Sequence, residues 1–295
     1  MRYEAPDTLS GAVALLAGAT GEARVLAGGT DLLVQMRADV VDPDLIVDIK
    51  RIPETRTVTE ENGGWRIGAA VTGAELKEHA RLKQAWPGVV EAANLIGSTQ
   101  VQGRATLGGN LCNGSPAADS VPALIAAGAV ATLAGPKGTR DLPVEDVMLG
   151  PRQLALTKGE IVVSFLLPPR PPRSSDAYLR FIPRTEMDIA VVGAGVSLTI
   201  DGGGTITAAR VSLGAVAARV LLVAEAAQAI VGSRLDEAAQ KRLDAAARAA
   251  CRPIDDKRGT VEFRVDVAGV LARRAAVIAL DRARGGAANG GGRSH

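Results

Sequence analysis

The sequence feature that most restricts the fold is the polar, glycine-rich stretch at residues 106–124, TLGGNLCNGSPAADSVPAL. Gly and Pro are unfavourable inside helices and strands, and Asn, Asp and Ser offer the backbone competing hydrogen bonds. We therefore expect an ordered loop rather than one regular element. Because Gly108 and Gly109 lack side chains, we expect their amides to stay uncovered, so that a phosphate or a flat ring can approach. A plain turn between a strand and a helix is the simpler interpretation of a lone Gly-Gly pair.

A second stretch of the same kind lies upstream, VLAGGTDL at 25–32. Its apolar start predicts a short buried strand, Gly28 and Gly29 break it, and Thr30 or Asp31 predicts the N-cap of a brief helix. Strand, glycine turn and helix start together favour an anion, because both the uncapped amides and the helix dipole attract negative charge. Neither stretch matches the GxGxxG dinucleotide pattern or the Gly-Lys-Ser/Thr nucleotide loop.

The cysteine and histidine content excludes several kinds of site. The chain has two cysteines, Cys112 and Cys251, in no CxxC motif, so it cannot hold an iron-sulfur cluster by itself. With no histidine nearby to activate it, Cys112 is interpreted as a small packing residue. Two histidines are too few for a Ser-His-Asp hydrolase or a His-ligated metal site. We predict no catalytic side chain and no metal ligand, so the chemistry must come from a bound cofactor.

Charge and hydropathy set further limits. A formal net charge of +2 is too small to indicate nucleic acid or an acidic membrane surface as a partner. An aromatic content of 2% also argues against platforms on which bases stack. The apolar runs are shorter than the roughly twenty residues that span a bilayer, and the start of the sequence lacks the basic and apolar parts of a signal peptide. These features predict a cytoplasmic protein without an integral membrane segment.

Residues 1–172 are predicted to form the first of two domains, ending at the proline-rich 168–173. Alternating helix and strand patterns divide this domain into subdomains at about 1–54 and 55–172. A helix is expected at 4–17. Thr72 and Glu75 have the spacing of a capping box at the start of another helix, which is expected to run through Leu82.

The second domain is predicted at 173–284, where the pattern changes from alternating helices and strands to strands first and helices afterwards. Alternating apolar residues predict three strands, at 178–182, 190–200 and 205–213. Ala, Leu and Val at helical spacing predict three helices, at 221–230, 236–249 and 263–284. The glycine-rich 285–295 is expected to be a disordered tail.

Taken together, these segments resemble the flavin-binding subunit of the molybdenum hydroxylases, the family of the carbon monoxide dehydrogenase medium subunits and of the xanthine dehydrogenase FAD domain. The matching segments are AGGTDLL at 27–33, TLGGN at 106–110, SPAAD at 115–119, EMDIAVVGAGV at 186–196 and DDKRGTVEFR at 255–264. The resemblance covers nearly the whole chain. It implies an α+β fold: a two-subdomain PCMH-type FAD-binding domain, followed by a C-terminal domain with a three-stranded antiparallel sheet and a helical bundle.

The resemblance also implies FAD as the cofactor. In the family, two glycine-rich loops hold the pyrophosphate and the ribityl chain. The positions that match these loops are Val25, Leu26, Ala27, Gly28, Gly29, Thr30, Asp31, Leu32, Thr106, Leu107, Gly108, Gly109 and Asn110.

Five further positions match family residues around the flavin. Asp119 corresponds to a position that accepts hydrogen bonds from cofactor hydroxyls, although it could instead be the N-cap of the following helix. Val162 corresponds to a strand residue near the adenine. Arg180 stands where the family often has Lys, and Asp188 with Ile189 matches the loop that faces the isoalloxazine ring.

The function implied by the resemblance is electron transfer in a multi-subunit oxidoreductase. A molybdenum-cofactor large subunit and an iron-sulfur small subunit would pass electrons to this FAD and on to an external acceptor, in a dimer of heterotrimers. One alternative is a stand-alone FAD oxidoreductase of the vanillyl-alcohol oxidase type, which generally has an aromatic-rich substrate domain that this chain lacks. The other is an assembly subunit without FAD, against which the intact glycines of both loops argue.

Overall fold

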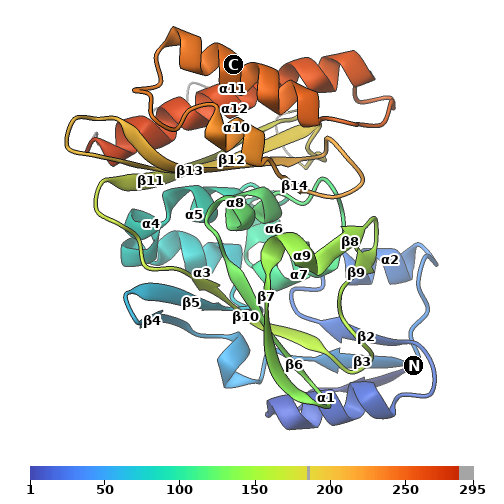
Figure 1. Ribbon diagram of the computed structural model, residues 1–295. Helices are drawn as coiled ribbons and strands as arrows, with labels where there is room; N and C mark the ends of the chain where they lie inside the picture. The colour runs from blue at the N-terminus through green and yellow to red at the C-terminus, as the bar shows by residue number, and fades with distance from the viewer. Residues whose placement is uncertain (185–186, 286–295) are drawn as a thin grey trace.

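The computed structural model describes residues 1–184 and 187–285 (Figure 1). The amino-terminal part is a small parallel sheet of order β1-β3-β2. Its elements are β1 (Arg2–Glu4), α1 (Leu9–Gly18), β2 (Ala23–Leu26), α2 (Leu32–Arg37) and β3 (Leu45–Asp48). The helix expected from residue 4 begins later, because residues 2–4 pair with β3 and the Thr8 side chain accepts the Gly11 amide as an N-cap.

The middle of the chain forms an antiparallel five-stranded sheet of order β4-β5-β10-β6-β7. Along the chain, this middle part contains η1 (Pro53–Thr55), β4 (Val58–Glu61), β5 (Gly64–Gly68), α3 (Gly73–Glu78), α4 (Ala80–Ala85), α5 (Pro87–Ala93), α6 (Thr99–Gln102), α7 (Leu107–Cys112), α8 (Ser120–Ala126), β6 (Val130–Gly135), β7 (Gly138–Pro143), α9 (Val144–Val147), β8 (Met148–Gly150), β9 (Gln153–Leu154) and β10 (Ile161–Leu167). Buried side chains such as Trp65, Leu124 and Phe165 join the sheet to these helices.

The capping box predicted at Thr72 and Glu75 is confirmed, with the Glu75 carboxylate accepting the Thr72 amide at 2.8 Å. The helix predicted through Leu82 is interrupted at His79, where ψ is 85°. The Nδ1 atom of His79 accepts the Leu82 amide at 3.2 Å and so caps the second helix, α4.

The C-terminal part is a four-stranded antiparallel sheet of order β11-β12-β13-β14. Its elements are β11 (Ser174–Phe181), β12 (Val192–Ile200), β13 (Ile206–Gly214), β14 (Leu221–Leu222), α10 (Ala224–Gln228), α11 (Glu237–Ala250) and α12 (Val261–Ala283). The prediction of three strands was wrong by one short strand. The apolar 221–230 begins by pairing Leu222 with Ser212, and only then turns helical.

The helices expected to form a bundle pack on the sheet as well as on one another. Helix α12 lies across β11 and β12, and α11 stacks on α12, so these helices form layers on one face of the sheet (Figure 1). Helices α5 and α8 cover the other face. Gly195 in β12 permits this packing, because a Cβ there would lie 2.5 Å from the Pro122 carbonyl oxygen.

Charged side chains hold the C-terminal sheet to the middle of the chain. Asp176 in β11 is 2% exposed, accepts the Val89 amide at 3.1 Å and pairs with Arg170 at 2.9 Å. Arg282 in α12 pairs with Glu91 in α5. The division at 172 and 173 stays a prediction, and the predicted tail lies outside the described residues apart from Gly285.

Candidate functional site

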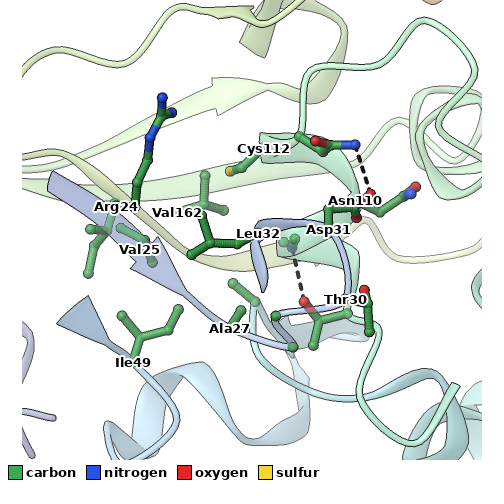
Figure 2. Close-up of a pocket in the computed structure, with 18 of the residues that line it drawn as sticks. Arg24, Val25, Ala27, Thr30, Asp31, Leu32, Ile49, Asn110, Cys112 and Val162 are labelled. Carbon is green, nitrogen blue, oxygen red and sulfur yellow. Dashed lines mark hydrogen bonds between the residues drawn. The ribbon is translucent and has the colours of Figure 1, made fainter. Parts of the chain in front are cut away.

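A cavity of about 350 Å³ lies between the two glycine-rich segments and is walled on a third side by β10 (Figure 2). Most of the predicted site residues line it. They are Val25, Ala27, Gly28, Gly29, Thr30, Asp31, Leu32, Thr106, Gly108, Gly109, Asn110 and Val162. Leu26 and Leu107 instead turn into the protein interior and are 7% and 1% exposed. Val25 was expected to be buried in a strand, but it faces the cavity and is 37% exposed.

The first glycine segment leaves a row of backbone donors free. Gly29 adopts a φ of +79°, which turns the chain sharply before α2. Within the described ranges, no protein acceptor takes the amides of Gly28, Gly29, Thr30, Asp31 or Leu32, and the first helical bond is Leu33 N to Gly29 O. Five consecutive amides without a protein acceptor, on residues that line the cavity, are the kind of donor set that binds an anion.

Gly28 fixes the first segment against the second. A Cβ at this position would lie 1.9 Å from the carbonyl oxygen of Arg104, so only glycine fits. The Arg104 Nε in turn donates to the Gly28 carbonyl at 3.4 Å. The backbone just before Thr106 therefore packs directly behind the free amides.

The two glycines of the second segment do not leave their amides free, which corrects the expectation from the sequence. Residues Leu107–Cys112 form α7, and the Thr106 side chain caps it by accepting the Gly109 amide at 2.9 Å. The Gly108 amide donates to Ala69 O at 3.1 Å. Thr is a strong N-cap, and its hydroxyl takes an amide that would otherwise face the cavity.

The glycines of the second segment provide space instead. A Cβ at Gly108 would lie 2.6 Å from the Ala69 carbonyl oxygen, so this residue lets α7 approach β5 and its following turn. At Gly109 the only described heavy atom near such a Cβ is the Thr106 Oγ1, at 3.1 Å. Gly109 therefore keeps the cavity open on the side opposite the free amides.

Asp119 and Arg180 meet each other just behind the cavity wall. The Asp119 carboxylate accepts from Tyr178 Oη at 3.0 Å and pairs with Arg180 Nη1 at 2.7 Å. Burial raises the pKa of Asp119 to about 6, and Arg180 and Tyr178 offset this only in part. The neighbouring Ser120 donates its amide and hydroxyl to Asn110 Oδ1, at 3.0 and 2.7 Å. Asp119 does occupy the N-cap position of α8, as the alternative interpretation predicted, but its side chain accepts no amide of that helix among the described residues.

Asp188 and Ile189 are not among the described residues that line the cavity. Asp188 accepts from Arg184 at 3.0 Å and lies 3.8 Å from Arg258, and the Arg184 hydrogen bond lowers the pKa of Asp188. Ile189 is 50% exposed. Glu186, at the start of the same motif, lies outside the described residues.

The cavity wall also contains polar residues that the sequence did not indicate. Arg24 pairs with Glu22 at 2.6 Å, and Arg152 has a φ of +59° with its amide bonded to Gly114 O. Arg24 directly precedes the first segment and could have been found by extending it by one residue. Arg152 lies in a turn that is distant in the sequence from the first segment, and no motif around it indicates a cavity residue. Apolar wall residues are Val41, Ile49, Ile96, Leu154, Leu156 and Ile161.

Cys112 lies at the cavity wall, which corrects its interpretation as a packing residue. Desolvation of its thiol raises the pKa to about 12, so the side chain is an unreactive thiol near neutral pH. Across residues 1–184 and 187–285, no group of three His, Cys, Asp or Glu side chains is arranged to hold a metal ion. In the same ranges, no helix has the length and apolar character to cross a bilayer.

The donors, charges and apolar wall together suit one kind of ligand. Five free amides favour an anionic group, whereas the two arginines of the lining are matched by the carboxylates of Asp31 and Glu160. The apolar wall with the open side at Gly109 admits flat, uncharged parts. A small metal ion or a purely apolar ligand would use only part of this cavity.

Comparison with known proteins gives matches along nearly the whole chain. Residues 1–170 match the family described as the FAD binding domain in molybdopterin dehydrogenase, and residues 177–278 match the CO dehydrogenase flavoprotein C-terminal domain. The carbon monoxide dehydrogenase medium chain of Afipia carboxidovorans is 34% identical over 282 residues, covering 96% of this chain and 97% of the relative. The xanthine dehydrogenase FAD-binding subunit of Escherichia coli is 35% identical over 203 residues, covering 68% of this chain and 69% of that subunit.

A solved structure agrees with these matches. A chain of the Cu,Mo-CO dehydrogenase, crystallised in its cyanide-inactivated form, superposes with a TM-score of 0.91 at 34% identity. The superposition covers 96% of this chain and 98% of the solved one.

Proposed function

The chain belongs to the FAD-binding medium subunits of the molybdenum hydroxylases, which are oxidoreductases, and on this premise we propose that it is the electron-transfer subunit of such a complex, with FAD held in the 350 Å³ cavity. We expect a molybdenum-cofactor large subunit and an iron-sulfur small subunit as partners, in a dimer of heterotrimers in the cytoplasm. The substrate would meet only the large subunit, so carbon monoxide, aldehydes, purines and N-heteroaromatics all fit this chain equally.

The observation that carries the proposal is the row of five free amides between Gly28 and Leu32. A pyrophosphate with about two negative charges is held well by inward-facing amides on a rigid loop. Gly28 supplies the rigidity through its contact with the Arg104 backbone. Arg24 and Arg152 also line the cavity, and Arg24 is paired with Glu22.

We assign the remaining residues by their place on the wall. Val162, with Ile49 and Ile161, supplies an apolar surface for the adenine. Gly109 leaves room for the ribityl chain, and the Asp119–Arg180 pair supports Asn110 through Ser120. Asp188 and Ile189 stay proposed as the residues facing the ring.

When bound, FAD supplies the capacity to accept electrons from one partner and release them to another. The residues of this chain contribute binding and orientation. The amide row holds the anionic centre, and the apolar wall keeps water from the rings. Desolvation raises the pKa of the Cys112 thiol, which favours its protonated form.

The test is FAD binding by the purified full chain, followed through the visible absorption of oxidised flavin. We expect bound FAD, and we expect Gly109→Val to weaken its binding at least ~tenfold, because the added carbons enter the cavity while the fold keeps its contacts. Gly18→Val is the matched control, since no described heavy atom lies within 4 Å of a Cβ there.

The outcomes separate the alternatives. A chain that takes up no FAD would contradict the electron-transfer proposal and favour an assembly role. A chain that binds FAD and oxidises an organic substrate without partners would favour the stand-alone oxidoreductase.

A further inference from the structure

Three polar side chains bridge the two glycine segments at the edge of the cavity, and we call them the clasp: Asp31, Gln35 and Asn113. The Gln35 Nε2 atom donates to Asn113 Oδ1 at 2.9 Å, and the Asn113 Nδ2 atom donates to Asp31 Oδ1 at 3.2 Å. Asp31 and Gln35 belong to the start and middle of α2, whereas Asn113 directly follows α7. All three line the cavity.

Helix α2 depends on this bridge because packing does little to hold it. None of its six described residues is buried. Leu33 and Val34 are 48% and 64% exposed. The loop that carries the five free amides leads directly into this helix, so a movement of α2 would displace the amides.

The carboxylate of Asp31 takes part in the bridge instead of capping its own helix. This residue occupies the N-cap position of α2, where Asp normally accepts an amide of the first turn. Among the described residues it makes no such cap, and its carboxylate accepts from Asn113 instead. Without Asn113, this carboxylate would be free to accept from the amides of its own segment and to compete with a bound phosphate.

We propose that Asn113 is a positioning residue for FAD, which holds α2 and the free amides in the binding geometry by bridging Gln35 and Asp31. This inference rests on the proposed function. The clasp ties the segment that supplies donors to the segment that supplies space. Because it keeps the free amides in the binding geometry, it slows FAD dissociation.

The experiment measures the rate at which FAD leaves the full-length holoprotein, from the rise of flavin fluorescence after dilution. Asn113→Ala removes both bonds and should speed release about tenfold, whereas Gln35→Ala removes one and should speed it about threefold. Asn113→Asp places a second carboxylate beside Asp31 and should release FAD at least as fast as Asn113→Ala.

A charge exchange tests the bridge itself. In the double variant Asp31→Asn/Asn113→Asp, the new amide donates to the new carboxylate, which also accepts from Gln35. Release should return to within about twofold of the wild-type rate. Gln228→Ala, an exposed position on α10, is the control for Gln35→Ala and should leave the rate unchanged. The unfolding midpoint of the apoprotein should stay the same throughout, because the three side chains lie at the surface of the cavity.

Equal release rates for the wild type, Asn113→Ala and Gln35→Ala would contradict the proposed role of the clasp and leave the FAD assignment intact. A double variant that releases FAD as fast as Asn113→Asp would also overturn it, because the loss would then be independent of the bridge. Should Asn113→Ala fail to fold, Gln35→Ala and the double variant still decide the question. A wild-type chain that binds no FAD would instead contradict the proposed function.

Discussion

The two Gly-Gly segments differ more in structure than their sequences suggest. At Gly28 and Gly29 the backbone leaves regular structure, and five successive amides stay without a protein acceptor among the described residues. At Gly108 and Gly109 the backbone is helical, and both amides are bonded inside the protein. The first segment therefore supplies donors, and the second supplies space.

The difference comes from the residue that could act as a cap. Thr106 precedes its glycines and captures the Gly109 amide with its hydroxyl. Asp31 follows its glycines, and its carboxylate is held away from the amides by Asn113. A glycine pair thus indicates a close approach of backbone, but its neighbours and its tertiary partners decide what comes close.

The largest effect is expected where the first segment meets the second. In Gly28→Ala, the new Cβ would lie 1.9 Å from the Arg104 carbonyl oxygen, and neither backbone can move without moving the cavity wall. We expect the free energy of unfolding to fall by at least ~3 kcal/mol, measured by urea denaturation. Gly18→Ala, which meets no described atom within 4 Å, should be neutral or slightly stabilising. An unfolding free energy near the wild-type value for Gly28→Ala would show that the segments are not rigidly packed.

A smaller effect is expected within the second segment, where two adjacent glycines do different things. Gly108→Ala places a Cβ 2.6 Å from the Ala69 carbonyl oxygen and should cost about 1–3 kcal/mol of unfolding free energy. Gly109→Ala should change it by no more than about 1 kcal/mol, because its Cβ meets only the Thr106 hydroxyl and alanine favours the helix. Denaturation of the two apoproteins side by side checks this order, and equal costs would contradict it.

The smallest effect separates the two potential caps. Thr106→Ala removes the bond to the Gly109 amide and should lower the free energy of unfolding by about 1 kcal/mol. Asp31→Ala removes no cap from α2 and should change it by less than about 0.5 kcal/mol. Thermal unfolding of the two apoproteins measures the contrast. A larger loss for Asp31→Ala would mean that the first segment is capped after all.

Much of the fold could be predicted from local pattern. The capping box at Thr72 and Glu75 was correct because both partners lie within one helical turn. The three longest strands of the C-terminal sheet follow from alternating apolar residues. The short fourth strand was missed because Leu222 pairs only with the already formed edge at Ser212, which nothing in its own sequence indicates.

The residues of the candidate site were likewise predicted only in part. The two glycine segments, and their meeting at one cavity, were predicted from residue types and from a family resemblance. Arg152 and Gln35 were missed, since each reaches the cavity only through the packing of its own element. Asn113 lies within the singled-out stretch 106–124 but was not named as a site residue. Asp188 and Ile189, expected near the ring, are not among the described residues that line the cavity.

The sequence by itself determined where the backbone must come close to something, because glycine is the residue that permits such contact in any fold. Apart from the Gly109 amide, which the neighbouring Thr106 takes, only the tertiary structure decided which amides stay free. That outcome depends on acceptors distant in the sequence: the Ala69 carbonyl takes the Gly108 amide, and the Arg104 carbonyl packs against Gly28 and takes no amide from the first segment. A hydrogen-bond donor is free or satisfied according to what lies opposite it, and that neighbour is set by long-range packing.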